Sequence, residues 1–226
     1  MHFLTAQLFF DLSLYAHASL WERGDSPWGA LHQLKKYLTS FPLGQIRSPI
    51  PQGVHLINPE LISIGIGVTI EPNVLIQGPC IIGDDCTIRH GAYLRENVIL
   101  GNRCQVGHAA ELKHAILLDD AAVTHFVYLG DSIVGNKANL GAGVKCANLR
   151  LDRQEISVDW ENQKVKSGLK KFGAIIGDGV QIGCNCVLNP GTLLGKESVC
   201  HPLLNIGGYI PPKSQIKAER KGIIHV

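Results

Sequence analysis

ELKHAILLDDAAVTHFVYLGDSIVGNKANLGAG, residues 111–143, is the stretch that decides the fold. It lies inside a six-residue repeat and departs from that repeat twice. The aliphatic anchors of the repeat are Ile64, Ile70, Ile76, Ile82, Ile88, Leu94, Leu100, Val106 and Leu112. A period of six matches neither the 3.6-residue turn of an α-helix nor the two-residue alternation of a continuous strand. Short strands that turn a corner every six residues do match it, so the sequence predicts a parallel β-helix.

Glycines and small residues fill two further positions of the repeat. Glycine follows the anchor at Gly65, Gly83, Gly101 and Gly107, and a small or β-branched residue comes four positions after each anchor, as at Val68, Val74, Cys80, Cys86, Ala92 and Cys104. Cys186 falls in the same small-residue position. The seven cysteines are an odd number, and such positions favour reduced, buried thiols in a cytoplasmic protein over a disulfide framework. Cys184 and Cys186 form one short pair without a second, so no metal site is expected.

The period shortens from six residues to five between Leu112 and Leu117, and again between Leu129 and Val134. The period is lost over residues 149–172. Two runs of alternating apolar and polar residues around a polar turn predict a β-hairpin there that projects from the coil. Three strands complete one coil of such a helix. Residues 18 apart, or 17 across a shortened step, are therefore expected to share a column, about 4.8 Å from each other.

One predicted column stacks two cations, Arg95 and Lys113. Two cations at this distance repel each other, so an anion of phosphate size bound between them is the functional interpretation. A solvated basic face without a ligand is the alternative. The same spacing places Glu111 in one column with Tyr93 and Tyr128.

A second predicted column contains three histidines, His90, His108 and His125, and continues through Ala142 and Cys184. A histidine in this column would serve as a general base near neutral pH. The small residues that follow would leave a groove for a long ligand arm. Hydrogen-bonded surface histidines and a metal-ligand set are the alternatives, and the lack of a carboxylate in the column argues against the metal.

Composition excludes other classes of protein. The formal net charge of +2, from 21 Lys+Arg and 19 Asp+Glu, argues against nucleic acid as a partner. No apolar run reaches the roughly 18 residues of a membrane span, so no membrane insertion is expected. The predicted organisation is a helical segment over 1–44, a Pro- and Gly-rich linker over 45–58 and the β-helix domain over 59–226. In the first segment, Trp28, Leu31, Leu34 and Leu38 follow helical spacing.

The pattern ELK-x11-HFVYLGD-x7-NLGAG resembles the acetyltransferase domain of the bifunctional glucosamine-1-phosphate acetyltransferase/N-acetylglucosamine-1-phosphate uridyltransferase family, over residues 64–210. The later run ANLRLD…SGLKKFGAIIG is similar to the archaeal-type sugar-1-phosphate enzymes. This resemblance implies an all-β fold, a left-handed parallel β-helix, in a homotrimer with active sites between subunits. It also implies acetyl-CoA as cosubstrate, no metal for acetyl transfer and a place in UDP-N-acetylglucosamine biosynthesis.

The resemblance also assigns roles to individual residues. His125 would accept the proton of the attacking amine, with Glu111 positioning it. The sugar phosphate would be bound by Arg95, Lys113, Tyr128, Asn139 and Lys171, and the acetyl-CoA arm would lie against Ala142, Asn148 and Cys184. The expected acceptor is glucosamine-1-phosphate or galactosamine-1-phosphate.

The sequence departs from the family in three ways. No nucleotidyltransferase domain is recognised, which leaves a separate nucleotidyltransferase as a potential partner. Leu149 stands where the family has a tyrosine, and the hairpin replaces a short loop, so the acceptor is left open. A nucleotide-linked amino sugar, an O-acyl acceptor and a non-catalytic trimeric scaffold are the alternatives. The helical segment over 1–44 matches nothing in the family.

Overall fold

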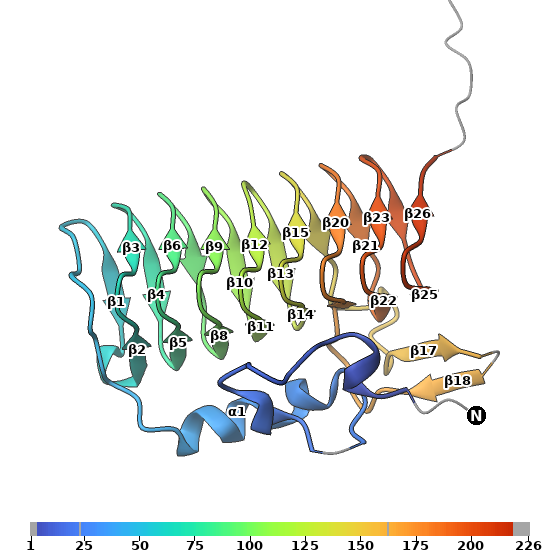
Figure 1. The fold of residues 1–226 in the computed structure, drawn as a ribbon, viewed down its shortest axis with the longest axis horizontal. Coiled ribbons are helices and arrows are strands. Elements are labelled where there is room, and N and C mark those ends of the chain that lie inside the picture. Colours follow the sequence, from blue (N-terminus) through green and yellow to red (C-terminus); the bar gives the residue numbers. More distant parts are fainter. Residues whose placement is uncertain (1–3, 23, 162, 219–226) are drawn as a thin grey trace, which may run out of the picture.

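The chain winds into a coil whose three sides are parallel β-sheets, in a computed structural model that describes residues 4–22, 24–161 and 163–218 (Figure 1). Sheet A runs in the order β2 (Ile62–Ile64), β5 (Cys80–Ile82), β8 (Val98–Leu100), β11 (Ala115–Leu117), β14 (Ile133–Val134), β19 (Ala174–Ile176), β22 (Thr192–Leu194) and β25 (Tyr209–Ile210). Sheet B contains β1 (His55–Ile57), β4 (Leu75–Gln77), β7 (Tyr93–Leu94), β10 (Glu111–Lys113), β13 (Tyr128–Gly130), β16 (Lys145–Cys146), β21 (Val187–Leu188) and β24 (Asn205–Ile206). Sheet C contains β3 (Thr69–Ile70), β6 (Thr87–Ile88), β9 (Gln105–Val106), β12 (Ala122–Val123), β15 (Asn139–Leu140), β20 (Gln181–Ile182), β23 (Val199–Cys200) and β26 (Gln215–Ile216).

The anchors and the small residues of the repeat fill the inside of the coil. The nine anchors from Ile64 to Leu112 are at most 4% exposed, and the small residues that follow them are at most 6% exposed. Apolar side chains point inward at these positions while their neighbours in each strand point outward. The predicted parallel β-helix is therefore confirmed.

The two shortened steps lie at corners between sheets B and A. His114 alone separates β10 from β11, and it has a positive φ of 48°; Asp131 follows β13 with a φ of 46°. The vertical register across these coils is 17 residues, as in the pairs Glu111↔Tyr128 and Ile116↔Ile133. Each shortened step is thus a tighter corner and not a break in the coil.

The N-terminal segment covers the outside of sheet A (Figure 1). It contains η1 (Ala6–Leu8), η2 (Ala18–Leu20) and α1 (Gly29–Ser40), and α1 buries Leu31, Leu34 and Leu38, as the helical spacing predicts. The outward residues of sheet A beneath it are Ile81, Ile99, Ile116, Ile133, Ile175 and Leu193, all 0–5% exposed. Sheet A is therefore an internal face of the molecule.

Two segments outside the repeat join the same structure. The predicted hairpin is present as β17 (Ser157–Trp160) and β18 (Gln163–Lys166), and Ile156 and Val158 bury themselves beside the N-terminal segment. The predicted linker over 45–58 is not simply a linker, because β1 lies within it and pairs with β4. The coil thus begins before the first anchor of the six-residue period, Ile64. The 3-10 helix η3 (Pro59–Leu61) connects β1 to sheet A.

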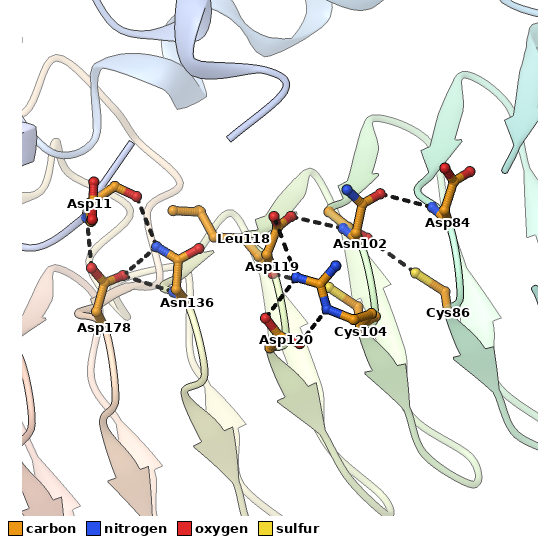
Figure 2. A network of polar contacts seen from close by, with 12 residues as sticks. Asp11, Asp84, Cys86, Asn102, Cys104, Leu118, Asp119, Asp120, Asn136 and Asp178 are labelled. Atoms are coloured by element: carbon orange, nitrogen blue, oxygen red, sulfur yellow. Dashed lines mark hydrogen bonds and ion pairs between the residues drawn. The ribbon is translucent and has the colours of Figure 1, made fainter. Parts of the chain in front are cut away.

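A ladder of carboxylates and amides lines the corner between sheets A and C (Figure 2). This corner ladder consists of Asp84, Asn102, Asp119, Asn136 and Asp178. Asn102 accepts the Asp84 N–H at 2.9 Å, and Asp119 accepts the Asn102 N–H at 2.8 Å. Each such side chain therefore ties its own coil to the preceding one. Gly101 leaves the space for the Asp119 carboxylate, which a Cβ at that position would overlap.

Among the described residues, no helix combines the length and the apolar character that crossing a membrane requires.

Gly101→Ala is expected to lower the free energy of unfolding by about 1–3 kcal/mol, because the new methyl group displaces the Asp119 rung and the backbone beneath it. Gly207→Ala is the matched control, since its Cβ would meet only the end of the Asn189 side chain, at 3.3 Å. Urea unfolding monitored by circular dichroism measures both. Equal losses for the two variants would contradict the steric role of Gly101.

Candidate functional site

Six polar side chains gather where the strands of sheet B run into the corner with sheet A. This corner cluster consists of Arg95, Glu111, Lys113, Tyr128, Asp131 and Asn148. Four of them, Arg95, Glu111, Lys113 and Tyr128, are adjacent to an inward residue of β7, β10 or β13, so alternation along the strand turns them outward. Asp131 and Asn148 lie in the turns that follow β13 and β16. Four successive coils thus contribute to one patch.

Arg95 pairs with a carboxylate of the next coil and keeps one donor free. Its Nη1 lies 3.1 Å from Glu111 Oε1, and its guanidinium lies 5.9 Å from the centre of the Tyr93 ring. Its Nε is buried and has no hydrogen-bond partner among the described residues. A buried donor without a partner is costly, so this N–H is suited to an acceptor that arrives with a ligand.

Lys113 also has a carboxylate neighbour. Its Nζ lies 3.8 Å from Asp131 Oδ2, and the two side chains are only 18% and 8% exposed. The repulsion predicted between Arg95 and Lys113 is therefore offset inside the chain by Glu111 and Asp131. The stacked cations alone do not require a bound anion.

Asn148 and Tyr128 complete the corner cluster. Asn148 Nδ2 donates a short hydrogen bond to Asp131 Oδ2. Burial, and then the negative charges of Asp131 and Glu111, raise the pKa of Tyr128, whose hydroxyl therefore stays protonated well above neutral pH. Tyr128 is paired in register with Glu111, as the sequence predicts.

The predicted histidine column is present at the corner between sheets C and B. Phe126 N–H donates to the His108 carbonyl at 2.9 Å, and Gly143 N–H donates to the His125 carbonyl at 2.8 Å, so the coils stack in the expected register. The rings of His90 and His108 are nearly parallel, with centroids 5.5 Å apart. His125 itself is exposed and lies at the open surface of the corner.

The same column continues upward through small residues. Asn185 N–H donates to the Ala142 carbonyl at 2.8 Å, which places Cys184 directly above Ala142. Cys184 is exposed, whereas the other six cysteines are buried and every cysteine is free. Beside this column, sheet C carries a groove of about 310 Å³ lined by Asn139, Gln181, Ile182, Gly183, Cys200 and Pro202.

The structure separates the predicted site residues into two groups. Arg95, Glu111, Lys113, Tyr128 and Asn148 form the corner cluster, and Lys171 lies next to it, because Leu149 and Lys171 pair at the base of the hairpin. His125, Ala142 and Cys184 lie at the opposite edge of sheet B, and Asn139 lies on sheet C. One chain therefore does not bring Asn139 to the corner cluster.

Glu111 does not contact His125. Its carboxylate pairs with Arg95, and in the described part of the chain no hydrogen bond reaches the His125 ring. The positioning role that the resemblance gives to Glu111 stays a prediction.

Two residues of the site are absent from the sequence-based prediction. Asp131 forms an ion pair with Lys113 and accepts a hydrogen bond from Asn148. The five-residue step in which Asp131 lies is the sequence feature that could have indicated it. Phe126 follows His125, has a positive φ of 57° and is 56% exposed. Its ring meets the His108 ring edge-on, with the two ring centroids 5.1 Å apart. Bulky residues rarely adopt this backbone conformation, and no sequence pattern distinguishes the position.

The described residues contain no group of three or more His, Cys, Asp or Glu side chains arranged to hold a metal ion.

Comparisons with known proteins find several to which parts of this chain are similar. The family described as the GMPPB C-terminal domain matches residues 76–163. The bifunctional sugar-1-phosphate nucleotidylyltransferase/acetyltransferase of Sulfurisphaera tokodaii is 29% identical over 151 residues, which cover 59% of this chain and 38% of the relative. The bifunctional protein GlmU of Methanococcus vannielii is 39% identical over 85 residues, which cover 38% of this chain and 20% of the relative. Among solved structures, the UDP-N-acetylglucosamine acyltransferase from Campylobacter jejuni has a TM-score of 0.46 at 12% identity, covering 72% of this chain and 69% of that chain.

The repeat, the coil and the outward polar columns define a hexapeptide-repeat β-helix protein. Within that class the chain is similar to parts of the bifunctional sugar-1-phosphate nucleotidylyltransferase/acetyltransferases, which confirms the resemblance found in the sequence. The chain matches between a fifth and two fifths of the length of these relatives.

Cys184 is expected to be the one cysteine that reacts rapidly with a chromogenic disulfide reagent in the native protein. The thiolate is the reactive form, and burial raises the pKa of Cys146 and of Cys200 to about 12. Absorbance of the released thiol should show one fast equivalent, lost in Cys184→Ser and retained in Cys200→Ser. A fast phase that survives Cys184→Ser would show that one of the six other cysteines is accessible and would contradict the prediction.

Proposed function

We propose that the chain is an acetyl-CoA-dependent N-acetyltransferase that acts on an amino-sugar-1-phosphate, either glucosamine-1-phosphate or galactosamine-1-phosphate. The observation that carries the proposal is the presence of two features on opposite edges of sheet B, which neighbouring chains would bring together. One edge has an exposed histidine at the start of a column of small residues. The other has the corner cluster, with two cations and a free buried donor.

In the proposed reaction, His125 accepts a proton from the amine of the sugar. The amine nitrogen then forms a bond to the carbonyl carbon of the thioester, and the bond between that carbon and sulfur breaks. The sulfur leaves as a thiolate and takes up the proton that His125 accepted, so the products are an N-acetyl sugar and the free thiol of coenzyme A. A histidine is suited to this proton transfer because its ordinary pKa lies near neutral pH.

The residues beside His125 fit a long, narrow cosubstrate. Ala142 and Cys184 leave room above the histidine, since neither side chain extends far from the coil. Gly143 follows Ala142 with a positive φ of 75°, so the turn presents no side chain at that position. Acetyl-CoA would lie along this column with its acetyl end toward His125, and the groove on sheet C lies beside the same path.

The corner cluster supports a phosphorylated acceptor. A phosphate oxygen would satisfy the buried Nε of Arg95, and Lys113 and the exposed Lys171 would add positive charge. Charge-assisted hydrogen bonds of this kind are stronger than those between neutral groups. Tyr128, protonated at neutral pH, would donate to a sugar hydroxyl.

A homotrimer would complete this site. Asn139 and Tyr128 lie on different sheets of one chain, so both contact one sugar only if neighbouring chains face each other. Sheet A is covered by the N-terminal segment, which leaves sheets B and C for such contacts. The arrangement agrees with the one that the family resemblance implies.

Release of thiol from acetyl-CoA tests the proposal directly. Glucosamine-1-phosphate, galactosamine-1-phosphate and a UDP-linked amino sugar are compared in parallel as acceptors. Release with either sugar-1-phosphate supports the proposal. Release with the UDP-linked sugar alone would reassign the acceptor, and no release with any of them would overturn the enzymatic function.

His125→Ala is expected to lower kcat at least roughly 100-fold, because the base that takes the amine proton is removed. The trimer should persist, since the exposed ring contributes no core packing. His90→Ala is the matched control, because it removes another exposed histidine of the same column. Near-normal turnover in His125→Ala would show that another group is the base.

Arg95→Met is expected to raise the KM for the sugar phosphate while changing kcat little, because a contact made equally in the ground and transition states is lost. Arg103→Met removes an arginine that pairs with Asp120 at a different corner, and it should leave KM unchanged. Steady-state kinetics with glucosamine-1-phosphate and with glucosamine measure the effect. An equal rise in KM for both acceptors would argue against a phosphate contact.

A further inference from the structure

Asp131 is a buried carboxylate to which the proposed reaction gives no role. It is 6% exposed, and it lies in the second shortened step of the repeat with a φ of 46°. Ionised carboxylates are seldom buried unless they are paired, so the partners of Asp131 account for its burial.

The backbone around Asp131 is fixed from both sides. Its N–H donates to the Lys113 carbonyl at 2.9 Å, and its carbonyl accepts the Gly173 N–H at 2.8 Å. The residue is thus held between the coil below and the coil above. Its side chain has little freedom to move independently of the site.

One oxygen of Asp131 serves two residues with different proposed roles. Oδ2 accepts the hydrogen bond from Asn148 Nδ2 and lies 3.8 Å from Lys113 Nζ. Lys113 belongs to the proposed phosphate contacts, and Asn148 is a residue that the family resemblance places against acetyl-CoA. Their shared atom is therefore the place where the two halves of the site meet.

We propose that Asp131 is the positioning residue that holds Lys113 and Asn148 in one arrangement, so that the contacts to the phosphate and to the acetyl group form together. This inference rests on the proposed function.

A carboxylate is the group that this position requires. Both partners are donors, and an ionised carboxylate accepts from both without donating to either. An amide would have to turn its oxygen toward one partner and its NH₂ group toward the other, or share one oxygen without the charge. The low exposure of Lys113 and Asp131 strengthens their attraction, because little water separates them. The charge of Asp131 also extends to Tyr128, whose pKa it helps to raise.

Asp131→Asn tests the role without a change of shape. Asparagine tolerates the positive φ, so the corner is retained while the charge is lost. Asp120→Asn is the matched control, because Asp120 also has a positive φ, of 61°, and also pairs with a cation, Arg103. The melting temperature of each variant reports whether the fold is kept.

The expected kinetic result involves both halves of the site. In Asp131→Asn, the KM for glucosamine-1-phosphate should rise about tenfold and kcat should fall about tenfold, the order expected for a hydrogen bond to a charged group. The KM for acetyl-CoA should rise less, because Asn148 would contact only its acetyl end, and Asp120→Asn should resemble the wild type. A merely structural role would lower kcat with the folded fraction and would leave the acceptor KM alone. Unchanged acceptor kinetics in a folded Asp131→Asn protein would overturn the proposal.

A double-mutant cycle with Lys113→Met separates direct from indirect effects. If Asp131 acts on the phosphate through Lys113, then Asp131→Asn should no longer raise the acceptor KM in the Lys113→Met protein. Fully additive effects of the two substitutions would contradict that coupling.

Ultraviolet titration of Tyr128 tests the arrangement without any substrate. Loss of the Asp131 charge should lower the pKa of Tyr128 in Asp131→Asn and not in Asp120→Asn, and Tyr128→Phe identifies the transition.

Absence of acetyl transfer by the wild type would overturn the proposed function, and with it the catalytic meaning of Asp131. An unchanged Tyr128 titration would instead contradict the arrangement around Asp131 itself.

Discussion

The register of hydrogen bonds between successive coils is the constraint on which the rest of the structure depends. Most strands contain only two or three residues, so each contributes few bonds of its own. The corner ladder adds side-chain acceptors to those bonds, and glycines such as Gly101 leave the space that these side chains need. A slip of one residue would turn inward side chains outward. The same register therefore sets both the apolar interior and the outward polar columns.

The N-terminal segment removes one of the three faces from contact with solvent. The outward isoleucines of sheet A would otherwise form a long apolar stripe, and exposed stripes of this kind favour association. With sheet A covered, the outward polar side chains of the coil lie on sheets B and C and at the three corners of the coil. Two hydrogen bonds that join Asp178 to Phe9 and Asp11 hold the segment against the coil.

The sequence predicts the features that depend on residue spacing. It does not predict which of several nearby groups a side chain contacts. The period of six predicts the coil, and counting by 18 or 17 predicts that Glu111 pairs with Tyr128 and that His125 lies below Ala142. Counting does not reveal that Glu111 turns toward Arg95, because several groups lie within its reach. Strand β1 was missed because its core residue, Leu56, lies eight residues before the anchor Ile64 and so falls outside the six-residue spacing.

The hairpin shows what the coil tolerates. Between Asn148 and Phe172 the chain leaves the solenoid and returns, yet β16 still pairs with β21 and β14 still pairs with β19. The Phe172 N–H closes the gap by donating to the Asn148 carbonyl at 2.9 Å. Length at this corner is thus free to vary during evolution without disturbing the stack. Because the insertion starts and ends beside the corner cluster, such variation would alter the surroundings of Asn148 and Lys171 while leaving the architecture intact.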